Sequence, residues 1–229
     1  MNWDKTDIIK YLSKLRDYRT YLEICTPTTG NQFAKIDQSR FDVCHRLIYR
    51  CAKDFTDGRN IDFRSPSLDI SQCIADIHRS GFRYDIILVD PWHEYESSLR
   101  DMQVALNLLT DTGSIVIHDC YPQTDDIISP QFVPGPWCGV TFIAFVDFVA
   151  QNDGLEYRTI DTDFGCGVVQ KSRKPSDTNR PFVFRDSWNS VRNDPKAAFQ
   201  FMQKHRDLLL RLYSVDRFVR AEAEAALMS

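Results

Sequence analysis

The sequence lacks a long apolar run and lacks an excess of positive charge. No stretch of its 229 residues approaches the roughly 20 apolar residues that a membrane-spanning helix needs. Residues 1–17 are amphipathic and contain acids, so they do not show the apolar core of a signal peptide. The formal net charge of -4 argues against nucleic-acid binding through bulk electrostatics. We therefore expect a cytoplasmic protein with no membrane and no nucleic-acid partner.

The sequence also lacks CxxC pairs and internal repeats. Its seven cysteines are odd in number and scattered, which favours reduced, buried thiols over disulfides or a zinc site. Hydrophobic residues make up 43% and charged residues 26%, a composition typical of globular proteins and not of disordered ones. The length suits one domain with a sizeable core.

Apolar strand patterns alternate with helix patterns along most of the chain. Strands are expected over 20–25, 84–90 and 114–120, and helices over 4–17, 67–81, 94–113 and 137–152. In the first two-thirds, residues 46–51 and the residues after a turn near 57–60 also read as strands. Two last strands, 155–161 and 166–172, are joined by a short turn and should pair antiparallel. The pattern predicts a doubly wound α/β fold with a mostly parallel sheet.

The C-terminal part of the chain differs from the rest. A polar linker follows Lys171, so we divide the chain into a domain over 1–174 and a helical extension over 175–229. The extension carries an apolar stripe that needs a partner surface, either the chain's own domain or the same helices of a second copy in a homodimer. The stripe consists of Phe199, Met202, Leu209, Leu212 and Val215.

Polar residues follow the expected strands at the points where they end. Asp90 and His93 come after the strand 84–90, and His118 and Asp119 end the strand 114–120. Ligands bind outside the carboxyl ends of parallel strands, and two carboxylates with two imidazoles suit a divalent ion or a general base. An Asp after a strand is also a common helix cap, which is the alternative for Asp90. The four residues together favour a functional site.

Three segments carry a resemblance to a known family. They are YLEICTPTTG (21–30), the block from Tyr84 to Cys120 with its Asp-x-x-His-x-Tyr-Glu and His-Asp motifs, and the glycine-bearing final hairpin. In this order they resemble class I S-adenosylmethionine-dependent methyltransferases, in particular small-molecule O-methyltransferases, over about residues 18–171. The resemblance implies a Rossmann-like seven-stranded sheet with an antiparallel last strand. It also implies S-adenosylmethionine as cofactor and a small-molecule acceptor.

The resemblance further implies a set of cofactor contacts. The first loop has Cys25 where the family has its first glycine. Asp37 is the candidate for the acidic residue that holds the cofactor ribose. Ser65 falls in the region that lies near the adenine in the family. The implied cofactor residues are Glu23, Cys25, Thr26, Thr29, Gly30, Asp37, Ser65, Asp90, Pro91 and Trp92.

The implied chemistry is methyl transfer with His93 as the general base, and with His118 and Asp119 in the same catalytic group. A resemblance of this segment to catechol O-methyltransferase suggests that Asp90 and Asp119 hold a divalent metal ion. Cys120 stands where that family has a second oxygen ligand, and cysteine is a poor ligand for Mg²⁺, so His118 or water would have to complete the site.

Two alternatives to an active methyltransferase remain open. Cys25 in the first loop fits a catalytically relaxed protein of the same fold that serves as a binding partner or scaffold. An NAD-dependent oxidoreductase is disfavoured because no GxGxxG follows the first strand and because the last strand should be antiparallel. The loop over 129–142 should border the acceptor site, where Phe132 and Trp137 either face the substrate or anchor the loop.

Overall fold

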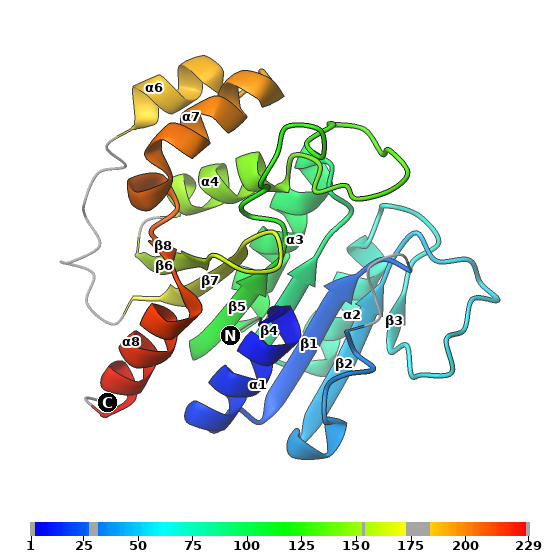
Figure 1. Ribbon diagram of the computed structural model, residues 1–229. Coiled ribbons are helices and arrows are strands. Elements are labelled where there is room, and N and C mark those ends of the chain that lie inside the picture. Colours follow the sequence, from blue (N-terminus) through cyan, green and yellow to red (C-terminus); the bar gives the residue numbers. More distant parts are fainter. Residues whose placement is uncertain (1–2, 28–31, 153, 173–183, 228–229) are drawn as a thin grey trace.

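The computed structural model describes residues 3–27, 32–152, 154–172 and 184–227, and its centre is one mixed β-sheet (Figure 1). The strand order is β3-β2-β1-β4-β5-β7-β6-β8. The strands are β1 (Thr20–Cys25), β2 (Val43–Ile48), β3 (Phe63–Arg64), β4 (Tyr84–Asp90), β5 (Leu109–Ile117), β6 (Leu155–Ile160), β7 (Cys166–Lys171) and β8 (Leu212–Tyr213).

The sheet confirms the expected topology. The strands β3, β2, β1, β4 and β5 are parallel to one another, and β7 pairs antiparallel with both β5 and β6. Seven strands match the prediction, and an eighth of two residues comes from the C-terminal extension and pairs parallel with β6. Because β1, β4 and β5 are adjacent and parallel, their carboxyl ends lie at the same edge of the sheet.

Helices cover both faces of the sheet. They are α1 (Lys5–Leu15), the 3₁₀ turn η1 (Gln38–Arg40), α2 (Ser71–Ser80), α3 (Tyr95–Leu108), α4 (Thr141–Gln151), α6 (Arg185–Val191), α7 (Pro195–Leu209) and α8 (Val215–Leu227). The core on one face includes α2, α3, α4 and α7, and the smaller core on the other includes α1 and α8. Among the described residues, no helix is long and apolar enough to cross a membrane.

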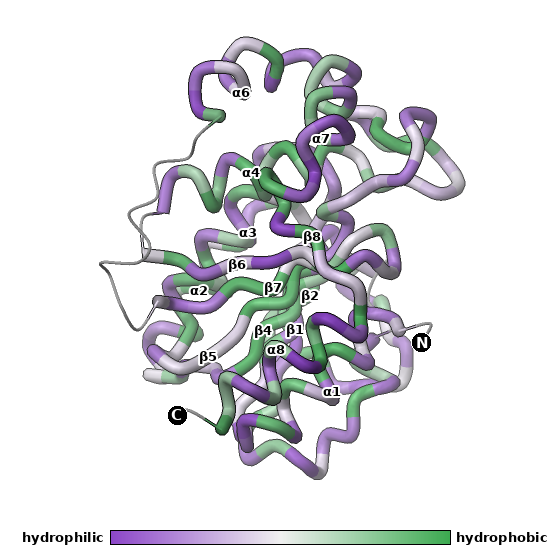
Figure 2. The backbone as a smooth tube through the Cα atoms, turned by 60° about the vertical axis from the view of Figure 1, so that its left-hand side comes forward, coloured by the Kyte–Doolittle hydropathy of each residue, from purple (hydrophilic) through white to green (hydrophobic). Residues whose placement is uncertain are grey.

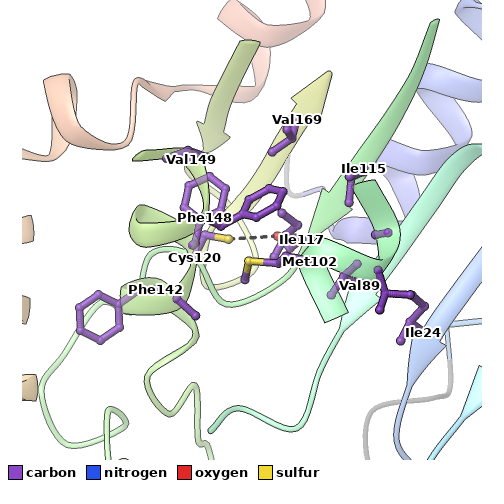
Figure 3. Packing of buried hydrophobic residues seen from close by; sticks show 14 of the residues in the cluster. Ile24, Val89, Met102, Ile115, Ile117, Cys120, Phe142, Phe148, Val149 and Val169 are labelled. Atoms are coloured by element: carbon purple, nitrogen blue, oxygen red, sulfur yellow. Dashed lines mark hydrogen bonds between the residues drawn. The ribbon is translucent and has the colours of Figure 1, made fainter. Parts of the chain in front are cut away.

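The larger core lies between the sheet and the helices α3 and α4. Figure 3 shows side chains of α4, such as Phe148, packed beside strand residues such as Ile117 and Val169. In Figure 2 the strands β4 and β7 are mostly hydrophobic, whereas α1 and α7 change between hydrophobic and hydrophilic residues. This is the expected difference between strands covered on both faces and helices that present one face to water.

Several expected boundaries were wrong, for local physical reasons. The helix expected over 67–81 begins at Ser71, because Ser67 and Asp69 accept hydrogen bonds within the preceding turn. The helix expected to end at Gly113 ends at Leu108, and β5 begins at once. Gly113 lies at an irregularity of β5, where a Cβ atom would come within 2.7 Å of the Asp85 carbonyl oxygen.

Two other segments also differ from the prediction. The helix expected over 137–152 begins at Thr141, and the strand expected over 46–51 runs from Val43 to Ile48. Between β1 and β2, the described residues form no α-helix; they contain the short turn η1 and an apolar cover in which Phe33 stacks against Tyr21.

The C-terminal extension packs on its own chain. Its helix α7 contacts α4, and Met202, Leu209 and Val215 of the apolar stripe are buried in the two cores. The buried carboxylate of Glu222 in α8 pairs with Arg16 at 2.7 Å and with Arg158 at 2.9 Å. The stripe that suggested a homodimer is therefore covered within the chain, and the extension contributes to the same cores as the domain before it.

Candidate functional site

Four of the predicted residues meet at the carboxyl ends of β4 and β5. Asp90 ends β4, His93 lies in the turn before α3, and His118 and Asp119 follow β5. Oδ2 of Asp119 lies 3.2 Å from Nδ1 of His93 and 3.1 Å from Nδ1 of His118. Nδ1 of His118 also lies 3.5 Å from Oδ1 of Asp90. Neighbouring strands thus bring the two sequence motifs into one buried cluster.

Two further residues complete the cluster, and sequence reasoning missed both. Nζ of Lys5 lies 3.2 Å from Oδ2 of Asp90 and 3.2 Å from Nε2 of His118. Asp163, in the turn between β6 and β7, places its Oδ2 3.3 Å from Nε2 of His118. The sequence held a signal for Lys5, because it occupies the same helical face as Ile8, Ile9 and Leu12. We find no such signal for Asp163.

The electrostatics of the cluster are dominated by mutual attraction. Burial works against ionisation of Asp90, which is 1% exposed, but Lys5 and His118 outweigh burial and hold the pKa of Asp90 well below its usual range. Burial likewise disfavours the Lys5 ammonium, yet Asp90 and Asp163 raise the pKa of Lys5. Asp119 and Asp90 raise the pKa of His118 in the same way. The cluster therefore holds its charges in pairs, as buried charges require.

The backbone around the cluster is strained. Asp119, Asp163 and Phe164 have φ angles of 60°, 48° and 57°, a left-handed conformation that is costly for residues other than glycine. The carbonyl groups of Phe164 and Gly165 accept hydrogen bonds from the residues that follow Asp119, at 2.9 Å each. Strain of this kind persists only where surrounding contacts hold it, and it concentrates at functional sites.

His93 is held from the side of α4. A Cβ atom on Gly139 would come within 2.1 Å of the His93 carbonyl oxygen, so only glycine allows this approach. The N–H of Val140 donates to the same oxygen at 2.9 Å, and Oγ1 of Thr141 lies 3.3 Å from Nδ1 of His93. These contacts fix the imidazole with its Nδ1 toward Asp119 and Thr141.

Three solved structures with a similar fold are described as O-methyltransferases. An O-methyltransferase from Bacillus cereus, in complex with SAH, matches with a TM-score of 0.54 at 12% identity, over 73% of this chain and 80% of the other. TomG, an O-methyltransferase from Streptomyces achromogenes in complex with SAM, gives 0.54 at 14% identity, over 73% and 79%. A putative O-methyltransferase from Klebsiella pneumoniae gives 0.52 at 14% identity, over 73% and 80%.

The chain has the fold of class I methyltransferases. No protein-family model matches the sequence, and no curated protein matches it. The methyltransferase fold therefore rests on the structure, with the sheet order and the antiparallel β7 as its main features.

Three aromatic rings, those of Trp92, Phe132 and Trp137, border the buried charged cluster. The Trp92 ring stacks on Phe132 at 5.2 Å and meets Trp137 edge-on at 4.9 Å, and Trp137 also contacts the His93 ring. Phe132 remains 49% exposed. The indole N–H of Trp92 is buried and has no hydrogen-bond partner in the described part of the chain. Trp137 donates to the Ser129 carbonyl at 2.7 Å, so it anchors the loop as well as lining the rim.

An arginine and an exposed aspartate flank β2 at its two ends. Arg50, with a φ of 53°, follows the end of β2, and its guanidinium lies 3.5 Å from the centroid of the Trp92 ring. Asp37, predicted as the ribose acid, precedes β2, is exposed and accepts hydrogen bonds from Ser39. It lies before the amino end of the strand, so the structure does not bring it to the site.

The other predicted cofactor residues that the structure describes lie at or near the carboxyl edge of the sheet. Glu23 is buried in β1 and accepts a hydrogen bond from the Tyr21 hydroxyl at 2.9 Å; burial raises the pKa of Glu23 to about 7. Cys25 pairs in register with Asp90, and Thr26 and Pro91 are buried beside the same edge. The Ser65 hydroxyl donates to the Ser67 and Asp69 carbonyls of its own turn. Thr29 and Gly30 lie outside the described residues.

Asp90 and Asp119, the predicted metal ligands, lie together with His93 in the cluster. Asp90, His93 and Asp119 offer ligand atoms that all lie within 4.8 Å of one another. However, the Lys5 ammonium already contacts the Asp90 carboxylate at 3.2 Å. A divalent ion would meet a fixed positive charge at one of its own ligands, so the donor set does not fit a metal ion while Lys5 is in place.

Proposed function

We propose that the chain is an S-adenosylmethionine-dependent methyltransferase that methylates an oxygen atom of a small molecule. The observation that carries this proposal is the buried His93–Asp119 pair at the carboxyl ends of β4 and β5, in a class I methyltransferase fold. The structural relatives described as O-methyltransferases in complex with SAH or SAM support the same choice of cofactor.

The residues at the ends of β1 and β4 fit such a cofactor. Glu23, Cys25 and Thr26 would border it on one side and Asp90, Pro91 and Trp92 on the other, and the unpaired indole N–H of Trp92 offers it a donor. Ser65, Thr29 and Gly30 would be further contacts of the cofactor. When bound, S-adenosylmethionine would supply an electrophilic methyl group.

His93 would remove the proton of the acceptor hydroxyl. In this role, with Asp119 and Thr141 beside Nδ1, the imidazole would carry its proton on Nδ1 and leave the lone pair of Nε2 free to accept another. The Asp119 carboxylate would then stabilise the imidazolium, and His118 would hold Asp119 from its other side. The role of His93 needs the acceptor oxygen within hydrogen-bond reach of Nε2.

The acceptor would enter beside Phe132 and Trp137. These rings form an apolar wall next to His93, which suits a small molecule with a ring or another flat apolar part. The exposed half of Phe132 is open to such a contact.

Two measurements test this function. The first is calorimetric titration with S-adenosylmethionine and, separately, with NAD. The second is a transfer assay from the methyl-labelled cofactor to a panel of phenols and sugars. Binding with turnover on one of these acceptors is the expected result. Binding without turnover on any acceptor class would favour the relaxed binding protein, and binding of NAD instead would favour the oxidoreductase. Absence of binding to either nucleotide would overturn the proposed function.

A further inference from the structure

The Lys5 ammonium lies inside the carboxylate cluster and not on the surface. The residue is 6% exposed, and Nζ faces Asp90 at 3.2 Å and Asp163 at 3.8 Å. Nε2 of His118 lies 3.2 Å from the same nitrogen. A lysine is rarely buried unless its charge is paired, so its presence here marks a place where the protein needs a positive charge.

The helix α1 holds Lys5 at this place. Asp4 caps the helix through the N–H groups of Thr6 and Asp7, and Lys5 is the first residue of the helix. The Lys5 N–H donates to Oδ2 of Asp163 at 3.1 Å, and the Thr6 hydroxyl donates to Gln32 at 2.8 Å.

The rest of α1 packs on the sheet. Ile8, Ile9 and Leu12 are fully buried in the core that includes Leu88 of β4 and Val116 of β5. Lys5 thus projects from a helix that is fixed against the sheet, and its backbone lies at a defined distance from the cluster.

A divalent ion and the Lys5 ammonium would compete for the same carboxylate. The three residues with ligand-like geometry are Asp90, His93 and Asp119, and Asp90 is the one that pairs with Lys5. The ammonium already supplies positive charge at the point where an ion held by these residues would supply it. Two cations this close repel each other strongly in a buried site.

We propose that Lys5 is the resident cation of this site and takes the place of a divalent metal ion. Lys5 is a positioning residue: it neutralises Asp90 and orients His118 and Asp163, so the cluster keeps its shape without a metal. The proposal goes beyond the proposed methyl transfer, because it concerns which cation the cluster holds and stands whether or not that reaction takes place.

Removal of the ammonium should create a metal site. Lys5→Met keeps most of the length of the side chain and removes the ammonium from Asp90, so that His118 is the remaining basic group beside Asp90 and Asp119. We expect the wild-type protein and Lys5→Arg to show no Mn²⁺ binding that depends on Asp90, in calorimetric or electron paramagnetic resonance titrations. Lys5→Met should gain at least ~10-fold in Mn²⁺ affinity, and Asp90→Asn added to Lys5→Met should abolish the gain.

The matched control is Lys35→Met, which removes an exposed lysine that pairs with Asp4 at 3.2 Å near the start of the same helix. It should bind Mn²⁺ as the wild type does. Circular dichroism of each variant verifies folding. Wild-type Mn²⁺ binding that is lost on Asp90→Asn would overturn the proposal by itself, even if Lys5→Met did not fold. A folded Lys5→Met variant with no gain in affinity would also overturn it.

Discussion

The two halves of the sheet's carboxyl edge differ in how they treat charge. At β4 and β5, Asp90, Asp119 and Asp163 each contact a histidine or Lys5, and nearly all of this polar group is buried. At β1 and β2, Cys25 stands where the resemblance places a glycine, and Arg50 lies beyond the end of β2 with its guanidinium over the Trp92 ring.

In the proposed function, this difference assigns proton transfer to the β4–β5 half and contacts with the cofactor to the β1–β2 half. The β4–β5 half would supply His93 and Asp119 for proton transfer. The β1–β2 half has Cys25 and Arg50 at its edge, where the cofactor would bind. The proposed proton transfer and the proposed cofactor binding can therefore be tested separately.

The largest expected effect comes from removing the base of the β4–β5 half. His93→Gln should lower the rate of methyl transfer by roughly 100- to 10,000-fold, because the acceptor proton loses its receiver, while the affinity for S-adenosylmethionine stays the same. Steady-state kinetics and calorimetry check the two parts. His205→Gln in α7, whose ring contacts Phe184 and Phe201, serves as the control. Lost cofactor binding with an unchanged rate at saturation would place His93 on the cofactor side instead.

A second prediction breaks the pairing of charges in the same half. Asp90→Ala leaves the buried Lys5 ammonium without its nearest carboxylate and should lower the free energy of unfolding by about 3–5 kcal/mol. Urea unfolding measures the loss. Asp111→Ala removes the 96% exposed partner of Lys171 and should cost less than about 1 kcal/mol. Equal stability of the two variants would show that the cluster is not held by this pair.

The third prediction concerns the buried carboxyl group of the β1–β2 half. The pKa of Glu23 is about 7 in the folded protein against 4.5 for an ordinary glutamate, so the folded state keeps its proton at pH values where the unfolded state has lost it. The contribution of Glu23 to stability should therefore fall as the pH rises from about 4.5 to about 7, and stay constant above that.

Glu23→Gln removes this dependence. The difference in unfolding free energy between the variant and the wild type should change by about 3 kcal/mol in favour of the variant over that pH range. Glu156→Gln, at an exposed position, is the matched control substitution. A flat difference for Glu23→Gln would mean that Glu23 is ionised in the folded protein over this pH range.

The smallest expected effect sharpens the contrast at β2. Arg50→Glu would offer a carboxylate to the ribose hydroxyls and should tighten binding of S-adenosylmethionine by roughly tenfold, because hydrogen bonds to charged groups are worth more than neutral ones. Arg50→Ala is the reference, since both variants lose the stacking on Trp92. If both variants bind the cofactor equally, the end of β2 does not face the ribose.

Much of the architecture could be read from local patterns. The apolar run 86–89 and the run 115–117 are buried strands, and the short turn before Cys166 produces the antiparallel β7. Patterns of this kind are readable because a strand covered on both faces needs a continuous apolar run. Asp90, His93, His118 and Asp119 were readable for the same reason, because each follows such a run directly or within a few residues.

The sequence by itself determined the alternation of strands and helices and the polar residues at the ends of β4 and β5, because both depend on residues close together in the chain. Only the tertiary structure decided that Lys5 and Asp163 complete the cluster, that Arg50 lies on Trp92, and that Asp37 lies apart. These outcomes depend on contacts between elements far apart in the chain, such as that between Lys5 and Asp163, which are separated by 158 positions. A buried charge is stable only beside an opposite charge, and in this cluster the opposite charge comes from a distant part of the chain.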